Sequence, residues 1–426
     1  MADDVTELDF FRGSELIADP YPYYEALRQK CPVTPEKHHG VTMVTGWDEA
    51  CAVLNDADTW SSCISVTGPF PGFPVSLEGL ENGDITELIE EHRDELPFSD
   101  QLPTLDPPTH TNHRSLMMRL ITPKRLKENE DAMWVLADQA LDDFLAPGHG
   151  EWIKGFASPF TLLVIADLLG VPMEDRDKFV KGIAEHAGGG IGGTKGSLAH
   201  SPLEFLYGLF SDYVQDRRKA PRDDVLTGLA SATYPDGSIP DVEDVARVAS
   251  NVFSAGQETT VRLLGASLQT IAERPEIQAQ LRKDRSLIPN FIEESLRHES
   301  PVKGDFRMNR RPVNVGGVDL PAGTTVMIVQ AAANRDPRRF DDPAAFDPAR
   351  KNARQHISFG RGIHSCPGAP LARAETRVAI ERLLDRTSDI RINESVHGPA
   401  NDRRYQYVPT YILRGLTELH LEFTPA

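Results

Sequence analysis

Residues 359–368 read Phe-Gly-Arg-Gly-Ile-His-Ser-Cys-Pro-Gly, which places one cysteine in a loop between glycines. Glycine carries no Cβ, so Gly360 and Gly362 allow the backbone to turn tightly and to approach a flat ligand closely. Pro367 suits the first turn of a following helix, because N–H groups in that turn have no partner within the helix and proline has no N–H group. Cys366 then lies at a helix N-terminus, where free N–H groups favour the thiolate over the thiol. The loop therefore predicts a reactive or metal-binding sulfur.

The residues around Cys366 leave three roles open for it. A nucleophile needs a base within hydrogen-bond reach, and His364 is two residues away. A metal ligand needs the same thiolate form. The third role is a buried reduced thiol, because free cysteine is among the most buried residue types. No small hydrolase signature surrounds Cys366.

The spacing aromatic-Gly-x-Gly-x-His-x-Cys-x-Gly resembles the haem-binding loop of the cytochrome P-450 superfamily at every fixed position. This resemblance implies that Cys366 is the axial thiolate ligand, and therefore the metal ligand, of a haem iron. It also implies that Phe359 packs near the sulfur, that Gly360 borders the cofactor, and that His364 approaches a haem propionate.

Composition and length are compatible with one large globular fold. The chain has 426 residues, of which 40% are hydrophobic and 26% charged, enough to bury a large core. Length alone would suggest two or three domains. The resemblance instead implies a single triangular domain over residues 1–426 that is mainly α with a smaller β region. Its helix-rich parts are expected at about 106–300 and 350–390, and its β-rich parts at about 35–60, 300–330 and 390–426.

The charge and the N-terminus limit the possible partners. A net charge of −19 speaks against nucleic acid as a partner. The first residues are acidic and lack the apolar core of a signal peptide, and no apolar run reaches the roughly 18 residues of a spanning helix. We therefore expect a cytoplasmic protein without a membrane anchor. The four cysteines show no CxxC spacing, so neither a zinc site nor a disulfide framework is indicated.

The N-terminal part predicts a mixture of elements. We expect a short helix around residues 24–28, a strand at 41–44 and a helix at 47–54. Residues 61–105 are rich in glycine and proline, with one short acidic helix near 88–91. A loop of this length inside a domain is usually functional or disordered. The resemblance implies that it caps the haem pocket and contacts substrate.

A helix is expected after the turn Asp106-Pro107-Pro108, and it carries His110 and Arg114 on one face. A solvated helix face is the simpler interpretation of such a pair. By resemblance, both side chains grip a haem propionate through charge-assisted hydrogen bonds. Thr111 occupies a position where many relatives have another basic residue, so only the first two are assigned.

The strand region after residue 300 supplies further candidates. Arg307 lies ten residues before Gly317, a placement that resembles the third propionate ligand of the family. The same resemblance implies that Val302 and Gly304 face substrate. Near the C-terminus, residues 407–415 resemble a hairpin that reaches into the pocket, and residues 416–423 alternate like an edge strand.

The longest predicted helix covers residues 240–273 and contains Ala255-Gly256-Gln257-Glu258-Thr259-Thr260. A glycine in mid-helix costs about 1 kcal/mol relative to alanine, and threonine hydroxyls can bond to the carbonyl four residues earlier. Helix packing alone would explain a small residue here. The acid–alcohol pair resembles the family's oxygen-activation groove, in which Ala255 borders the haem, Thr259 holds a hydrogen-bonded water and Glu258 relays protons.

Two further patterns are an acid–base pair on one helix face and a cluster of glycines. Glu294 and Arg297 lie on one helix face; alone they would be a surface ion pair, but the resemblance implies a buried pair that holds the segment 334–348 ahead of the cysteine loop. The glycine cluster at 188–193 lacks the strand and the Lys-Ser pair of a phosphate loop, so a flexible lid is the better interpretation.

Together these motifs imply a haem-thiolate monooxygenase with haem b as cofactor and O2 as co-substrate. It would insert one oxygen atom into a C–H or C=C bond of an apolar small molecule. Two electrons would come from a ferredoxin and its reductase, because the chain has no flavin or iron–sulfur motif, and Arg354 and Arg361 would help the donor dock. The alternatives are a peroxide-driven haem-thiolate enzyme, a haem-binding gas sensor and a colourless cysteine-nucleophile transferase.

Overall fold

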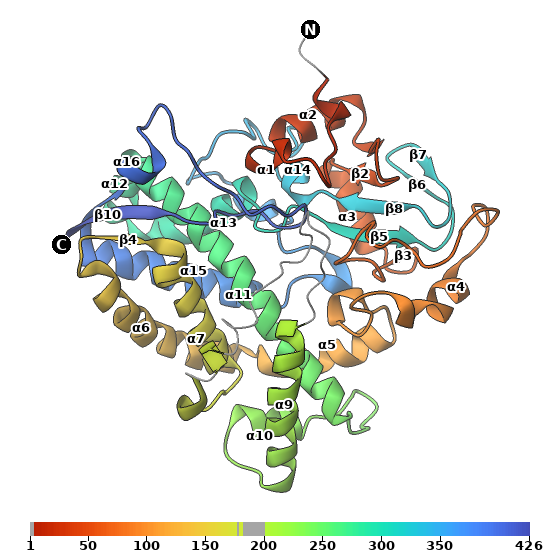
Figure 1. Ribbon diagram of the computed structural model, residues 1–426, viewed down its shortest axis with the longest axis horizontal. Coiled ribbons are helices and arrows are strands. Elements are labelled where there is room, and N and C mark those ends of the chain that lie inside the picture. Colours follow the sequence, from red (N-terminus) through yellow and green to blue (C-terminus); the bar gives the residue numbers. More distant parts are fainter. Residues whose placement is uncertain (1–3, 177–178, 182–200) are drawn as a thin grey trace.

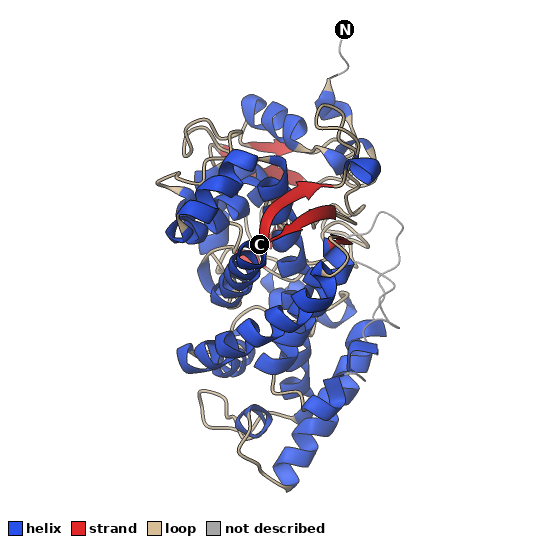
Figure 2. Cartoon of the chain, turned by 90° about the vertical axis from the view of Figure 1, so that its left-hand side faces the viewer, coloured by secondary structure: helices blue, strands red, loops and turns tan. Residues whose placement is uncertain are grey.

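The computed structural model describes residues 4–176, 179–181 and 201–426. This part of the chain is mainly helical, with three smaller sheets, as predicted. The strands lie in the upper half of the molecule in Figure 2, and helices extend through the lower half. The glycine cluster at 188–193, for which a lid was predicted, lies outside the described residues.

Eight helices form the body of the described chain. They are α5 (Thr109–Leu120), α6 (Pro123–Leu145), α7 (Ser158–Leu168), α9 (Ser201–Lys219), α11 (Val242–Glu273), α12 (Pro275–Lys283), α13 (Ile288–His298) and α15 (Ala369–Arg386). The other α-helices connect them or cover the main sheet. These are α1 (Glu15–Ala18), α2 (Tyr21–Lys30), α3 (Trp47–Asn55), α4 (Thr86–Glu91), α10 (Val225–Ala230), α14 (Gln330–Ala333) and α16 (Glu394–His397).

Local sequence explains several helix ends. The Thr122 hydroxyl accepts a hydrogen bond from the backbone N–H of Arg125 at 3.2 Å and caps α6. Pro123 occupies the first helical position, where an N–H group would have no partner within the helix. Pro275 cannot continue a helix, so α11 ends before it and Pro275 becomes the first residue of α12.

Helix α11 crosses the middle of the molecule, between α6, α7 and α15 on one side and the main sheet on the other (Figure 1). It is α-helical without interruption, and its apolar stripe, including Val245, Val248 and Leu263, is buried. Ala255 is exposed although buried residues precede and follow it along the helix. The methyl group of Ala255 is therefore not covered by another part of the described chain.

The main sheet has five strands in the order β1-β2-β8-β5-β3. Its strands are β1 (Val33–Pro35), β2 (Thr42–Val44), β3 (Trp60–Ser61), β5 (Asp305–Asn309) and β8 (Thr325–Ile328). Strand β2 pairs with β8 in parallel, with Met43 opposite Met327, and the other pairs are antiparallel. Strands β6 (Val313–Val315) and β7 (Val318–Leu320) form a separate hairpin around Gly316 and Gly317.

The C-terminal strand differs from the prediction. Strand β10 (His420–Pro425) was expected at the edge of a sheet, but it lies between β4 (His149–Glu151) and β9 (Thr387–Ile392) and pairs with both. The alternation of side chains reports two faces of a strand and not the number of its neighbours. Within the predicted β-rich segment at 35–60, the helix expected at 47–54 is present as α3.

Apolar burial is concentrated around α11. The largest cluster of buried apolar side chains joins α5, α6, α7, α11, α13 and α15, and two smaller clusters flank the main sheet. None of the helices in the described ranges combines the length and the hydrophobicity needed to span a bilayer.

Candidate active site

The cysteine loop is shaped by two glycines with positive φ angles. Gly360 has φ +64° and Gly362 has φ +68°, conformations that other residues rarely adopt. A Cβ at Gly362 would also come within 2.3 Å of the Leu54 carbonyl oxygen, so a larger residue does not fit there. The Cys366 N–H donates to the Phe359 carbonyl at 2.8 Å and closes the loop.

The helix after the loop begins later than predicted. Helix α15 starts at Ala369, and Pro370 occupies its first turn, whereas Pro367 precedes the helix. The N–H groups of Gly368 and Ala369 nevertheless point at the Cys366 sulfur. The predicted donors at the helix start are therefore present, although the helix begins three residues after the cysteine.

Cys366 combines an exposed side chain with close surroundings of protein atoms. Its side chain is accessible to solvent, yet the protein surrounds it closely enough for burial to raise the pKa of the thiol. The two N–H groups and the guanidinium of Arg114 act in the opposite direction on this pKa. Ligation of a metal cation would favour the thiolate further.

The predicted propionate ligands come together in space. The rings of His110 and His364 lie 4.2 Å apart between their centres, although 254 positions separate them in the chain. Arg114 donates to the Ser365 carbonyl at 2.6 Å, so α5 is joined directly to the cysteine loop. Arg307 is near enough for its charge to act on both histidines. Residues from α5, β5 and the loop thus form one basic cluster.

Positive charge dominates this cluster, although Asp305 pairs with Arg307 at 3.3 Å. Burial, followed by the charge of Arg114, lowers the pKa of His110 to about 4. Burial and the charges of Arg307, His110 and Arg114 lower the pKa of His364 to about 2. Within the described residues the buried His110 Nε2 has no hydrogen-bond partner. A bound carboxylate would supply both the missing acceptor and negative charge.

An acidic residue missed by the sequence analysis holds the loop before α5. The Asp106 carboxylate is buried and accepts a hydrogen bond from Ser61 Oγ at 2.5 Å. It also forms ion pairs with Arg93 at 2.6 Å and with Arg310 at 2.8 Å. The Ser62 N–H donates to it at 2.9 Å. The Asp-Pro-Pro turn is the sequence signal for this residue, but its partners lie far away in the chain.

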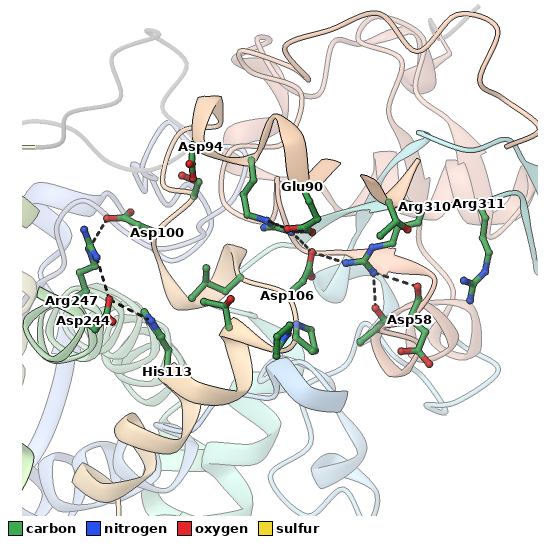
Figure 3. A pocket seen from close by; sticks show the side chains of 18 residues that line it. Asp58, Glu90, Asp94, Asp100, Asp106, His113, Asp244, Arg247, Arg310 and Arg311 are labelled. Atoms are coloured by element: carbon green, nitrogen blue, oxygen red, sulfur yellow. Dashed lines mark hydrogen bonds and ion pairs between the residues drawn. The ribbon is translucent and has the colours of Figure 1, made fainter. Parts of the chain in front are cut away.

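A cleft of about 830 Å³ opens beside Asp106, between the segment 86–109 and the start of α11. Figure 3 shows that its lining is highly charged: Asp106 meets Arg310 at one end, and Arg247 bridges Asp100 and Asp244 at the other. The Asp100–Arg247 pair ties the segment at 61–105 to α11, and the Asp106–Arg310 pair joins the turn before α5 to the residue that follows β5.

Helix α11 presents the predicted acid–alcohol pair. Thr259 Oγ1 donates to the Ala255 carbonyl at 2.8 Å, the backbonding expected for a threonine in a helix. Glu258 forms an ion pair with Arg262, a buried residue that the sequence analysis did not single out. A Cβ at Gly256 would lie 3.0 Å from Ile165 Cδ1 of α7, so close helix packing accounts for the glycine.

Comparison with known proteins identifies the family. The profile described as Cytochrome P450 matches residues 201–388. The cytochrome P450 monooxygenase PikC of Streptomyces venezuelae is 32% identical over 418 residues, 96% of this chain and 92% of that protein. The chain belongs to the cytochrome P450 family.

Two further comparisons agree with this cytochrome P450 assignment. The 6-deoxyerythronolide B hydroxylase of Saccharopolyspora erythraea is 32% identical over 86% of this chain and 88% of its own length. The substrate-free structure of Mycobacterium marinum cytochrome P450 CYP150A6 is 53% identical and covers 99% of this chain and 100% of its own, with a TM-score of 0.93. This cytochrome P450 is therefore an oxidoreductase, a haem-thiolate monooxygenase.

The site residues fit the haem that a cytochrome P450 requires. The loop offers a sulfur ligand supported by N–H donors, and the basic cluster offers His110 Nε2 as a donor for a propionate. The main chain of β8 occupies the space that a side chain at Gly304 would need, because a Cβ there would lie 2.4 Å from the Ile328 carbonyl oxygen. Gly304, predicted to face substrate, therefore packs against β8 on that side.

The Glu294–Arg297 pair of this cytochrome P450 is buried, as predicted. Arg297 donates to both Glu294 carboxylate oxygens at 2.7 Å, and neither side chain is exposed. Arg297 also donates to the carbonyls of Asn334, Pro343 and Ala345 at 3.0, 2.8 and 2.9 Å. The pair therefore fixes the segment at 334–348, which leads to the cysteine loop.

Proposed function

We propose that this cytochrome P450 binds haem b through Cys366 and oxidises an apolar small molecule with electrons from a ferredoxin and its reductase. The observation that carries the proposal is the convergence of the Cys366 loop and the basic cluster of His110, Arg114, Arg307 and His364. When bound, haem supplies the activation of O2 by two electrons. A single domain over residues 1–426 and a cytoplasmic location, where a ferredoxin system delivers electrons, are part of the proposal.

The roles of the loop follow from its hydrogen bonds. Cys366 would be the thiolate ligand, held by the N–H groups of Gly368 and Ala369. Phe359 would shield the sulfur, because the main chains of Phe359 and Cys366 are joined by a hydrogen bond. Gly360 would allow the loop to lie close to the porphyrin, since its positive φ angle is strained for any residue with a Cβ.

The roles of α11 follow from its exposed middle turn. Ala255 would border the porphyrin without blocking the space above it, because its side chain is a single methyl group. Thr259 would hold a water through its hydroxyl, whose hydrogen already points to the Ala255 carbonyl, so the oxygen is free to accept. Glu258, half-exposed and paired with Arg262, would pass protons toward Thr259.

An electron donor would dock outside the cysteine loop. Arg354 is 74% exposed, and Arg361 lies over the Trp47 ring at 4.9 Å, so both offer positive charge near the loop in a chain of strong net negative charge. An acidic ferredoxin would be attracted to this face. Reversing both charges should slow the reduction and flatten its salt dependence, whereas unchanged values would mean that the docking face lies elsewhere.

The haem assignment is tested most directly by Cys366→Ala. The wild type should be coloured and give the thiolate-type spectrum of the reduced carbonyl complex, and the variant should lose that spectrum. Cys63→Ala is the matched control, because Cys63 is a buried thiol whose pKa is raised by burial and which lies outside the loop. Retention of the thiolate spectrum in the Cys366 variant would contradict the assignment.

The substrate class is tested by a ligand screen. Apolar compounds of several classes should produce the spin-state shift that accompanies displacement of water from the iron, and those that do should give an oxygenated product with NADH, ferredoxin and reductase. Turnover with hydrogen peroxide alone at the rate of the ferredoxin system would favour a peroxide-driven enzyme instead.

A further inference from the structure

A connected set of side chains supports the Cys366 loop from outside and ends at Arg373 of α15. The Arg373 guanidinium carbon lies 4.6 Å from the centre of the Phe359 ring, within the range of a cation–π contact. The Phe359 carbonyl in turn accepts the Cys366 N–H at 2.8 Å. The Arg373 cation therefore lies against Phe359, whose main chain is hydrogen-bonded to that of Cys366.

Glu293 of α13 determines how this cation is oriented. Arg373 donates through Nε and Nη2 to the two carboxylate oxygens of Glu293, at 2.7 and 2.9 Å. Such a two-point contact fixes the plane of the guanidinium. Glu293 is 2% exposed, so its carboxylate is held firmly, and the Arg373 side chain retains partial exposure of 37%.

His356 supports Glu293 from the other side. Its Nδ1 accepts the Ser358 N–H at 3.1 Å, so the ring hydrogen is on Nε2, which donates to Glu293 at 3.0 Å. Burial lowers the pKa of His356, in agreement with a neutral ring. The centre of this ring also lies 5.7 Å from the centre of the Phe359 ring. One buried carboxylate thus orients two side chains that contact the same phenylalanine.

The charge of Arg373 reaches the sulfur. Arg373 and Arg114 are both cations whose charges act to lower the pKa of the Cys366 thiol. Arg114 belongs to α5 and contacts the loop through the Ser365 carbonyl. Arg373 approaches from α15 and is paired with the Glu293 carboxylate, which also lies 3.8 Å from the exposed Arg354. Arg373 and Glu293 can be changed separately while Arg354 stays in place.

We propose that Glu293 positions Arg373 against Phe359 so that its charge sets how strongly the Cys366 thiolate donates electron density to the iron. This inference rests on the proposed haem-thiolate function. A positive charge near the sulfur favours the reduced iron, because the reduced form carries one more electron. Glu293 and Arg373 are therefore positioning residues that tune the reduction potential.

Two single variants separate charge from structure, because they change the local charge in opposite directions. Arg373→Gln removes a positive charge and should lower the potential, so that the equilibrium constant for reduction by a fixed mediator falls at least threefold. Glu293→Gln leaves Arg373 unbalanced and should raise that constant. The double variant should return near the wild-type value. The measurement is an anaerobic spectroscopic redox titration of the purified holoprotein.

Matched controls are available in the same helix. Arg382 of α15 pairs with Asp138 at 3.3 Å and lies 4.8 Å from the Trp134 ring centre, an arrangement that resembles that of Arg373 but lies outside the loop. Arg382→Gln should leave the potential unchanged. Arg373→Lys keeps the charge but cannot make the two-point contact, so its potential should lie between those of the wild type and Arg373→Gln.

The outcomes are distinct. A lower potential in Arg373→Gln together with a higher potential in Glu293→Gln supports the inference, and the reverse pair of shifts contradicts it. Unchanged potentials, or shifts of the same sign in both, overturn it, because a purely structural disturbance of the loop has no reason to follow the charge. If Arg373→Gln does not fold, Glu293→Gln and Arg373→Lys decide by the same criteria. A wild type without haem would overturn the proposed function itself, and this is visible before any variant is made.

Discussion

Arg262 lies one turn after Glu258 on α11 and forms an ion pair with its carboxylate. Its other terminal nitrogen lies 3.5 Å from the Leu416 carbonyl oxygen, and its aliphatic chain fills the space beside Gly415, where a Cβ would come within 2.1 Å of Arg262 Cδ. Glu258, the proposed proton relay, is therefore connected through one arginine to the C-terminal segment around Gly415 and Leu416.

Replacing Arg262 by Gln should release Glu258 and loosen this C-terminal segment. Because Glu258 is half-exposed, we expect a loss of stability of only about 1 kcal/mol. We expect the amount of product formed per NADH to fall several-fold, since Glu258, the proposed proton relay, is no longer held in place. Thermal unfolding and product yield should be measured together. Arg262→Lys keeps the charge and is the control; unaltered coupling in Arg262→Gln would contradict a positioning role.

Replacing Thr259 by Ala should uncouple electron consumption from product formation. The hydroxyl proposed to hold a water is lost, so NADH should still be consumed while product per NADH falls about tenfold and hydrogen peroxide accumulates. Thr259→Ser retains the hydroxyl and its bond to the Ala255 carbonyl, and should remain coupled. Tight coupling in the Ala variant would remove Thr259 from the proton path.

Replacing Arg297 by Ala should destabilise the fold strongly. Its removal leaves the buried Glu294 carboxylate without its two-point partner and three carbonyls of the segment 334–348 without a donor. A loss of about 3–5 kcal/mol and of bound haem is expected. Denaturant unfolding and haem content should be compared with Arg285→Ala, whose exposed ion pair with Asp385 should contribute under about 1 kcal/mol. Equal losses in the two variants would contradict the prediction.

Lys303 should make stability depend on pH above neutrality. It is 4% exposed, donates to the Thr410 carbonyl and lies 5.6 Å from the Phe10 ring centre. Burial, followed by the charge of Arg414, lowers the pKa of Lys303 from 10.5 to about 7. Between these pH values the unfolded chain binds a proton that the folded protein does not.

The free energy of unfolding should therefore rise with pH from about 7 to 10.5, by at most about 1.4 kcal/mol per pH unit from this group, and the gain should be absent below about pH 7. Lys303→Met removes this contribution, so the difference in stability between variant and wild type should shrink as the pH rises through this window. Lys124→Met, at a lysine that is 87% exposed, is the control. A pH-independent difference for Lys303→Met would show that the buried amine does not titrate there.

Motifs with short spacing were recovered well from the sequence. The helix at α11, the pairing of Glu294 with Arg297 and the turn after Asp106 depend on residues a few positions apart, whose relation is set by helix and turn geometry. The resemblance to a family added the partners of the pair in the segment 334–348. The predicted start of α15 was wrong, because two prolines, Pro367 and Pro370, lie near that end and either one suits the first turn of a helix.

Partners that are distant in the chain could not be inferred from local spacing. Glu293 and Arg373 are 80 positions apart, Asp106 and Ser61 are 45 apart, and nothing in the periodicity of either segment indicates the other. The same holds for strand β10, whose alternation shows two faces but not that neighbours lie on both sides.

By itself, the sequence determined the main helices, the cysteine loop and the family to which they point, because these depend on residue types at fixed short intervals. Only the tertiary structure decided that Arg262 would hold Glu258, that His110 would meet His364, and which buried groups would lack a partner. The physical reason is that hydrogen bonds, ion pairs and burial depend on distances in space, and the packing of the whole chain sets those distances.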